Sequence, residues 1–166
     1  MTSPKTTFEK LSNTSSVVAT WFGLGLIPKA PGTWGSLGAI PPALIIFHIG
    51  GLYVFIAVLI LLTPVAFWAT AQYEKSSGIH DNKEIVIDEV IGQWITLMPC
   101  FIYEPENFFW VILAFALFRL FDITKPGPVG YCDQKIEGAN GVMFDDIIAG
   151  CLAALVLTGG IHAGLG

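Results

Sequence analysis

The stretch Gly141-Val142-Met143-Phe144-Asp145-Asp146-Ile147-Ile148-Ala149-Gly150 places two adjacent carboxylates at the head of an uncharged segment. No Asp, Glu, Lys or Arg occurs from Ile147 to Gly166, and at about 1.5 Å per residue a helix of this length can cross a bilayer. Carboxylates beside such a segment cost free energy unless a cation compensates their charge. The stretch therefore predicts a membrane helix that begins at a pair of acids.

A second pair of acids, Asp88 and Glu89, also precedes an apolar run. A glycine follows each pair closely, Gly92 here and Gly150 in the first stretch. Acids at the start of a helix can simply interact with the positive end of its dipole. The repetition of the pattern favours a different interpretation, in which the two pairs are halves of one metal site.

The composition indicates an integral membrane protein. Of 166 residues, 54% are hydrophobic and 13% are charged, which is roughly half the charged fraction of a soluble domain. The length predicts a single domain over 1–166, in which 1–16 form a polar N-terminal tail that could be flexible. No basic stripe supports a nucleic-acid partner. The three cysteines lie far apart without C-x-x-C spacing, so neither a zinc site nor a disulfide framework is indicated.

Apolar runs predict the helices. The span from Ala30 to Tyr73 contains no charged residue and is too long for one crossing, so we expect two helices with a turn near His48-Ile49-Gly50-Gly51. The runs Val90–Tyr103 and Phe108–Phe118 are short for full spans, which allows for tilt, re-entry or mild thinning of the bilayer. The expected fold class is all-α, a small multi-helix integral membrane bundle.

The segment from Gly23 to Ser36 is dense in glycine and proline, which predicts an ordered loop at the membrane surface. Its glycines, beside Lys29, Thr33 and Ser36, would let backbone N–H groups close around a phosphate. The alternative is a plain connector. The segment is not a Walker A loop, because the order G-x-x-x-x-G-K-[ST] is absent.

The basic residues are segregated along the chain. Lys and Arg all fall in the N-terminal region or in and beside the polar stretches 72–84 and 122–141, whereas the turn near Gly50 and the loop Glu104-Pro105-Glu106 have none. By the positive-inside rule, the basic regions and the Gly/Pro-rich loop face the cytoplasm. This topology brings one set of polar residues to a single membrane face: Thr33, Asp88, Glu89, Asp122, Lys125, Asp145 and Asp146.

A cluster of carboxylates without His or Cys favours a hard cation such as Mg²⁺, which takes a substrate phosphate as a further ligand. Lys29, Arg119 and Lys125 could hold that phosphate, whereas Lys135 is better explained as a membrane-surface anchor. Arg119 and Asp122 could also form a simple ion pair at a helix end. The combination suits phosphoryl transfer or hydrolysis, although the same acids could instead line an ion path.

Five segments occur in a characteristic order: Pro31-Gly32-Thr33-Trp34-Gly35-Ser36-Leu37, Gly78-Ile79-His80-Asp81, Ile85-Val86-Ile87-Asp88-Glu89-Val90-Ile91-Gly92, Phe118-Arg119-Leu120-Phe121-Asp122 with Lys125-Pro126, and Gly141 to Gly150. Together they closely resemble the bacterial phosphatidylglycerophosphatase A family. The resemblance covers 20–165, and the first twenty residues lie outside it.

The resemblance implies an all-helical, Mg²⁺-dependent enzyme of phospholipid biosynthesis. It would hydrolyse the phosphomonoester of phosphatidylglycerophosphate to phosphatidylglycerol and phosphate. Its expected location is the bacterial cytoplasmic (inner) membrane, crossed several times, with the active site facing the cytoplasm. The positions that match the family motifs are Thr33, Asp81, Asp88, Glu89, Arg119, Asp122, Lys125, Asp133, Asp145 and Asp146.

From these positions, together with Lys29 and Ser36 of the Gly/Pro-rich segment, we assign expected roles. Metal binding is expected from Asp88, Glu89, Asp145 and Asp146. Catalytic roles are expected from Asp122, Lys125, Thr33 and Asp81, and substrate binding from Lys29, Arg119, Ser36 and Asp133. We expect a water molecule activated by the metal as the nucleophile, with an aspartyl phosphate on Asp122 as the alternative. The alternative function is a membrane cation transporter or channel subunit that uses the same acids, and the oligomeric state stays open.

Overall fold

Every regular element in the described part of the chain is helical. The computed structural model describes residues 13–136 and 138–164, so most of the predicted tail over 1–16 lies outside the described residues. The elements are α2 (Thr14–Ala19), the 3-10 helix η1 (Leu24–Leu26), α3 (Pro31–Ser77), α4 (Ile87–Tyr103), α5 (Phe108–Thr124), α6 (Pro128–Lys135) and α7 (Ala139–His162). The prediction of an all-helical chain is therefore confirmed.

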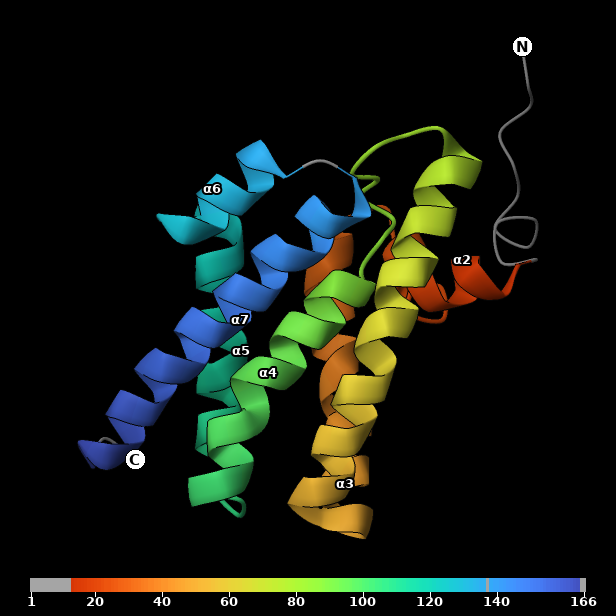
Figure 1. Cartoon of the computed structure of the whole chain (residues 1–166). Helices are drawn as coiled ribbons and strands as arrows, with labels where there is room; N and C mark the ends of the chain where they lie inside the picture. Colours follow the sequence, from red (N-terminus) through yellow and green to blue (C-terminus); the bar gives the residue numbers. More distant parts are fainter. Residues whose placement is uncertain (1–12, 137, 165–166) are drawn as a thin grey trace.

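Helix α3 is folded back on itself at Gly51 (Figure 1). Gly51 has φ 72° and ψ −176°, a conformation that a glycine adopts without a steric penalty. Trp94 of α4 donates a hydrogen bond from Nε1 to the carbonyl of Ala39 (2.8 Å), and its ring lies 5.4 Å from that of Phe55. On a straight helix Ala39 and Phe55 would lie about 24 Å apart. The predicted pair of helices with a turn near Gly51 is thus confirmed.

Two helices, α3 and α7, are long and apolar enough to cross a membrane by length and composition, which is compatible with membrane association. Helices α4 and α5 have 17 residues each, fewer than the roughly 20 needed for a perpendicular crossing. Their shortness agrees with the prediction from the two short apolar runs.

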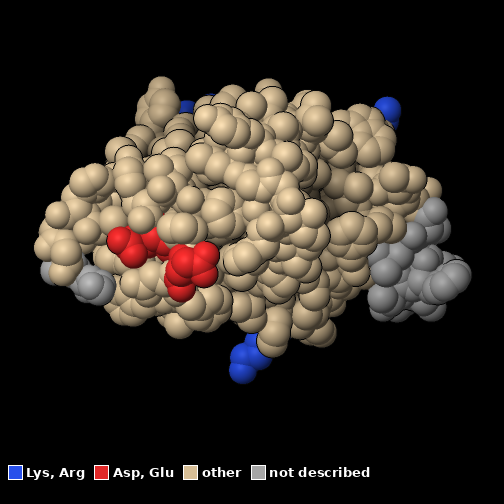
Figure 2. All heavy atoms as spheres, turned by 90° about the horizontal axis from the view of Figure 1, so that it is seen from below, with Lys and Arg blue, Asp and Glu red and all other residues tan. Residues whose placement is uncertain are grey.

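The two ends of the bundle differ in charge. Helix α4 begins beside Asp88 and Glu89 and ends at Tyr103, so the loop that carries Glu104 and Glu106 lies about 25 Å away from the first pair of acids. Viewed from the end where α4 runs into α5, the surface is almost entirely uncharged, with one acidic patch, and Lys and Arg atoms appear only at its margins (Figure 2). This arrangement agrees with the predicted segregation of basic residues.

Helices α4 and α7 touch through their backbones at Gly92 and Gly150. A Cβ atom built on Gly150 would lie 2.5 Å from the carbonyl oxygen of Gly92, which is closer than packed atoms approach. The Thr96 hydroxyl lies within hydrogen-bond distance of the carbonyl oxygens of both glycines, at 2.9 Å and 3.2 Å. Because Asp88 precedes Gly92 by one turn and Asp146 precedes Gly150 by one turn, this contact sets the two acidic pairs side by side.

The prediction of a loop from Gly23 to Ser36 was wrong in its second half. Helix α3 begins at Pro31, so Pro31–Ser36 is helical and the irregular segment ends at Ala30. Proline is favoured at the first position of a helix. The glycines inside the helical part serve close packing instead: a Cβ atom on Gly35 would lie 2.7 Å from Cβ of Val86.

The polar stretch 122–141 is not only a loop, as it was predicted to be. It contains the eight-residue helix α6, which packs against α7. Helix α7 starts at Ala139, earlier than the uncharged run suggests, so Asp145 and Asp146 lie nearly two turns inside it. The interpretation of these two acids as first-turn residues that interact with the helix dipole was therefore wrong, whereas Asp88 and Glu89 do occupy the first turn of α4.

Candidate active site

A cavity of about 400 Å³ lies where the start of α3, the start of α4, the end of α5 and the first half of α7 meet. The segment that leads into α4 closes one side. Its charged lining consists of Asp81, Lys83, Asp88, Glu89, Arg119, Asp122, Lys125, Asp145 and Asp146. Thr33 also lines it, so the seven residues predicted to share one face all line one cavity.

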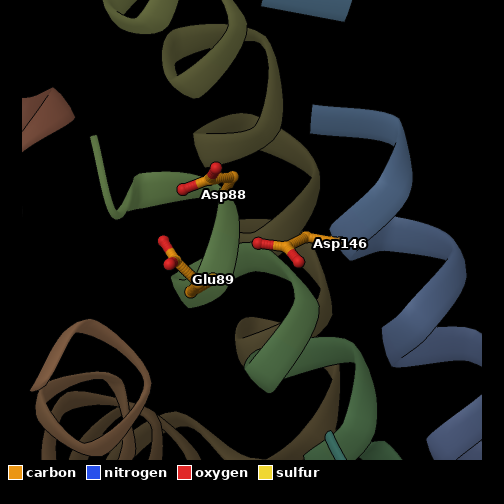
Figure 3. A group of neighbouring side chains, drawn as sticks. All are labelled: Asp88, Glu89 and Asp146. Carbon is orange, nitrogen blue, oxygen red and sulfur yellow. The ribbon is translucent and has the colours of Figure 1, made fainter. Parts of the chain in front are cut away.

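Three carboxylates converge in this cavity from two helices. Asp88 and Glu89 of α4 and Asp146 of α7 offer oxygens that all lie within 4.8 Å of one another (Figure 3). Asp88 and Asp146 are buried, at 7% and 3% exposed, and Glu89 is half-buried. Within the described part of the chain, Asp88 Oδ1 and Glu89 Oε2 have no hydrogen-bond partner. Such an all-oxygen cluster with free lone pairs fits a hard divalent cation.

The electrostatics of the first turn of α4 point the same way. Asp88 and Glu89 are neighbours in this turn, and their side chains are largely removed from solvent, so each negative charge is desolvated and repels the other. Both negative charges are therefore costly unless a cation compensates them.

Two basic side chains stand beside the three acids. Lys125, at the C-terminal cap of α5, places Nζ 2.8 Å from Oδ2 of Asp145. Arg119 forms an ion pair with Asp122 through Nη1, which also lies 4.0 Å from Oε1 of Glu89. Thus Asp145, the fourth predicted metal ligand, is paired with Lys125 and lies outside the three-carboxylate cluster.

Ser36 is not in the cavity lining, although it was predicted to bind substrate. It is fully buried, donates a hydrogen bond to the carbonyl of Gly32 (2.8 Å) and accepts one from Nη1 of Arg119 (3.3 Å). Its position indicates that it orients the Arg119 guanidinium.

Of the other predicted residues, Asp81 lines the cavity beside the start of α4. Lys29 is exposed and does not line the cavity, although the neighbouring Ala30 does. The side chain of Asp133 lies outside the described part of the structure.

Lys83 lines the cavity and was not predicted as a site residue. The segment that carries it is anchored on both sides of Lys83: the backbone N–H of Asp81 donates to Oε1 of Glu74 (2.9 Å), and the Tyr73 hydroxyl donates to Oε2 of Glu84 (2.6 Å). The signal in the sequence that could have identified Lys83 was its position two residues after Asp81.

Gln93 was also missed. It lies one turn after Glu89, is fully buried, and its amide nitrogen and oxygen have no partner among the described residues. A buried polar side chain therefore lies one helical turn beyond the acids, toward the C-terminus of α4.

The comparison with known proteins identifies the chain. A family model described as phosphatidylglycerophosphatase A matches residues 17–161. The chain belongs to the phosphatidylglycerophosphatase A family. A phosphatidylglycerophosphatase A of Escherichia coli (strain K12) is 41% identical over 149 residues, which cover 89% of this chain and 84% of that protein. A phosphatidylglycerophosphatase A of Haemophilus influenzae is 37% identical, with 89% and 88% covered. No solved structure matches the chain.

Proposed function

We propose that this member of the phosphatidylglycerophosphatase A family is a Mg²⁺-dependent phosphatase that converts phosphatidylglycerophosphate into phosphatidylglycerol and phosphate. The observation that carries the proposal is the convergence of Asp88, Glu89 and Asp146 within 4.8 Å in a cavity that also holds Arg119 and Lys125. The relatives from Escherichia coli and Haemophilus influenzae are both named phosphatidylglycerophosphatase A, which supports the choice of substrate.

In this proposal Asp88, Glu89 and Asp146 hold the metal, and Asp145 holds the Lys125 ammonium beside them through their ion pair. A bound Mg²⁺ would offset the acidic charge, accept a phosphate oxygen and supply an activated water for attack on phosphorus. The donor set fits this ion, because it contains carboxylate oxygens and neither His nor Cys.

The basic residues would bind the phosphate. The charged lining has six acidic residues and three basic residues, and the basic ones are Lys83, Arg119 and Lys125. Because the acids are in excess, a phosphomonoester is repelled unless cations stand close to it. Arg119 presents a planar guanidinium, fixed by Asp122 and Ser36, that suits two phosphate oxygens. Lys125 adds a point charge beside Asp145.

The start of α3 would complete the phosphate site. Residues Ala30 to Thr33 line the cavity, and no side chain caps the N-terminus of this helix. Pro31 has no backbone N–H and the Thr33 N–H donates to the Ala30 carbonyl (3.1 Å), so the Gly32 N–H and the positive end of the helix dipole are the features that favour an anion here. Asp122 and Asp81 complete the proposed catalytic set. The alternative nucleophile is the Asp122 carboxylate. Its ion pair with Arg119 would lower its nucleophilicity.

Binding of a phosphate mimic distinguishes the proposed enzyme from the transporter alternative. We expect vanadate binding to the detergent-solubilised protein to require Mg²⁺ and to weaken about 10- to 100-fold in Lys125→Ala, because a charge-assisted hydrogen bond is lost. Lys135→Ala is the matched control, since Lys135 is exposed and does not line the cavity. Isothermal titration would measure the binding.

The same preparations give the deciding activity assay. Phosphate release from phosphatidylglycerophosphate is measured in mixed micelles with and without Mg²⁺, and cation flux is measured in liposomes. We expect Mg²⁺-dependent release and no flux. Cation flux without phosphate release from any lipid phosphomonoester would favour the transporter hypothesis over the enzyme.

For location we propose the cytoplasmic membrane, with the cavity on the cytoplasmic side. The support is the segregation of Lys and Arg together with the two helices that are long and apolar enough to cross. In a variant without Cys100, Cys132 and Cys151, we expect Ile79→Cys and Pro105→Cys to react with an impermeant thiol reagent from opposite sides of the membrane. Reaction of both from one side would contradict the proposed topology.

A further inference from the structure

We propose that an acyl chain of the lipid substrate leaves the cavity over Ile123 and lies along an exposed apolar stripe of α5. The proposal rests on the proposed function, because it concerns the lipid whose phosphate occupies the cavity. We define the α5 stripe as Phe109, Ile112, Ala116, Leu120 and Ile123.

Among the branched aliphatic residues of the described cavity lining, Ile123 is the one that is open to the outside. Three branched aliphatic side chains of the described residues line the cavity. Ile85 and Val142 are buried, at 4% and 7% exposed, whereas Ile123 is 68% exposed. An apolar chain attached to a headgroup in this cavity therefore finds its apolar exit over Ile123.

The α5 stripe continues from this exit along one face of the helix. Its members are spaced by three or four residues, so they lie on one side of α5. Phe109, Ile112 and Leu120 are each at least half exposed, and none of the five carries a charge. The opposite face, with Trp110, Val111, Ala114 and Phe118, is buried in the bundle.

The length and position of the stripe fit a single acyl chain. From Ile123 to Phe109 the helix rises about 21 Å, which exceeds the roughly 15 Å of hydrocarbon in one leaflet. Lys125 follows Ile123 by two residues and lines the same cavity. The end of α5 thus offers a cation for the phosphate and an apolar surface for the chain that the same lipid carries.

The exposed apolar face of the second arm of α3, the part of that helix after Gly51, lacks this connection. Ile60 and Leu61 on this arm are 64% and 69% exposed, but neither lines the cavity. General bilayer lipid can cover this face, so contact with the substrate chain is expected on α5 and not here. Ile60 therefore supplies a matched control for the α5 stripe.

The test compares phosphatidylglycerophosphate with its deacylated headgroup, which keeps both phosphates and lacks the chains. We expect Leu120→Asn to lower kcat/KM for the diacyl lipid about tenfold, because one apolar contact with the chain is lost. Turnover of the deacylated headgroup should be unchanged, since Leu120 does not line the cavity. Ile60→Asn should change neither value.

A second measurement does not depend on turnover. A substrate analogue with a photoreactive group in one acyl chain should label the peptide Phe108–Thr124 more strongly than the peptide around Ile60. That excess should disappear in Lys125→Ala, in which the headgroup is no longer held.

The proposal is overturned by equal labelling of the two peptides, by unchanged diacyl turnover in Leu120→Asn, or by an equal loss for both substrates. Crosslinking between two chains through Leu120→Cys would show instead that a second copy covers the stripe. If the wild-type chain releases phosphate from neither substrate while the labelling excess persists, the proposed reaction fails and the lipid path stands.

Discussion

Asp88→Asn is expected to lower phosphate release roughly 100-fold or more while the helical fold is kept. Substitutions that only support metal ligands already cost about 10- to 100-fold, and Asp88 belongs to the cluster itself. The amide preserves the size of the side chain and removes one of three negative charges. In EDTA we therefore expect a higher Tm than that of wild type, because repulsion within the cluster falls.

The change of Tm with added Mg²⁺ distinguishes an acid that binds the metal from an acid with a structural role. Wild type should be stabilised as Mg²⁺ rises, since a bound ion favours the folded state, and Asp88→Asn should lose most of that Tm shift. Glu104→Gln is the control, because Glu104 lies in the loop about 25 Å from the cluster. Near-wild-type turnover of Asp88→Asn across Mg²⁺ concentrations would show that this acid interacts with the start of α4 and binds no metal.

Gly150→Ala is expected to reduce both stability and activity, although it lies one turn away from the nearest acid. The added methyl group meets the Gly92 carbonyl oxygen at 2.5 Å, and backbone atoms cannot rotate away as a side chain would. Overpacking of this kind costs about 1–3 kcal/mol. The helices must separate, which moves Asp146 away from Asp88 and weakens the cluster.

Gly159→Ala on the same helix is the matched control. A Cβ atom there meets nothing within 4 Å, so this change should keep activity and raise stability by about 0.5–1 kcal/mol through helix propensity. Thermal unfolding in detergent and phosphate release would be measured for both variants. Full activity of Gly150→Ala would mean that the spacing of the acids does not depend on this contact.

Much of the fold could be predicted because membrane-compatible helices leave a strong one-dimensional signal. The uncharged span from Ala30 to Tyr73 gave two helices, and its Gly50-Gly51 pair gave the turn. Helix α6 was missed because it has only eight residues and no apolar run. The helical start at Pro31 was missed because glycines that allow close packing resemble glycines that form loops.

It was easier to predict which residues form the candidate site than which of them contact one another. Four acids and their basic neighbours could be named from the motifs, and the structure brings them into one cavity. The sequence could not distinguish Asp145 from Asp146, because neighbours on a helix point about 100° apart. In the structure Asp146 turns toward Asp88 and Glu89, whereas Asp145 turns toward Lys125.

The reversal of α3 at Gly51 bears on how the chain would enter a bilayer. From Pro31 to Tyr73 the two arms and the turn between them lack Asp, Glu, Lys and Arg, so insertion of this part of the hairpin would carry no formal charge through the hydrocarbon core. Lys75, in the last turn of the second arm, would stay on the side of entry together with Lys29. Biogenesis could then begin with one spontaneous hairpin, against which α4 later packs through Trp94, before the acids of α4 and α7 meet.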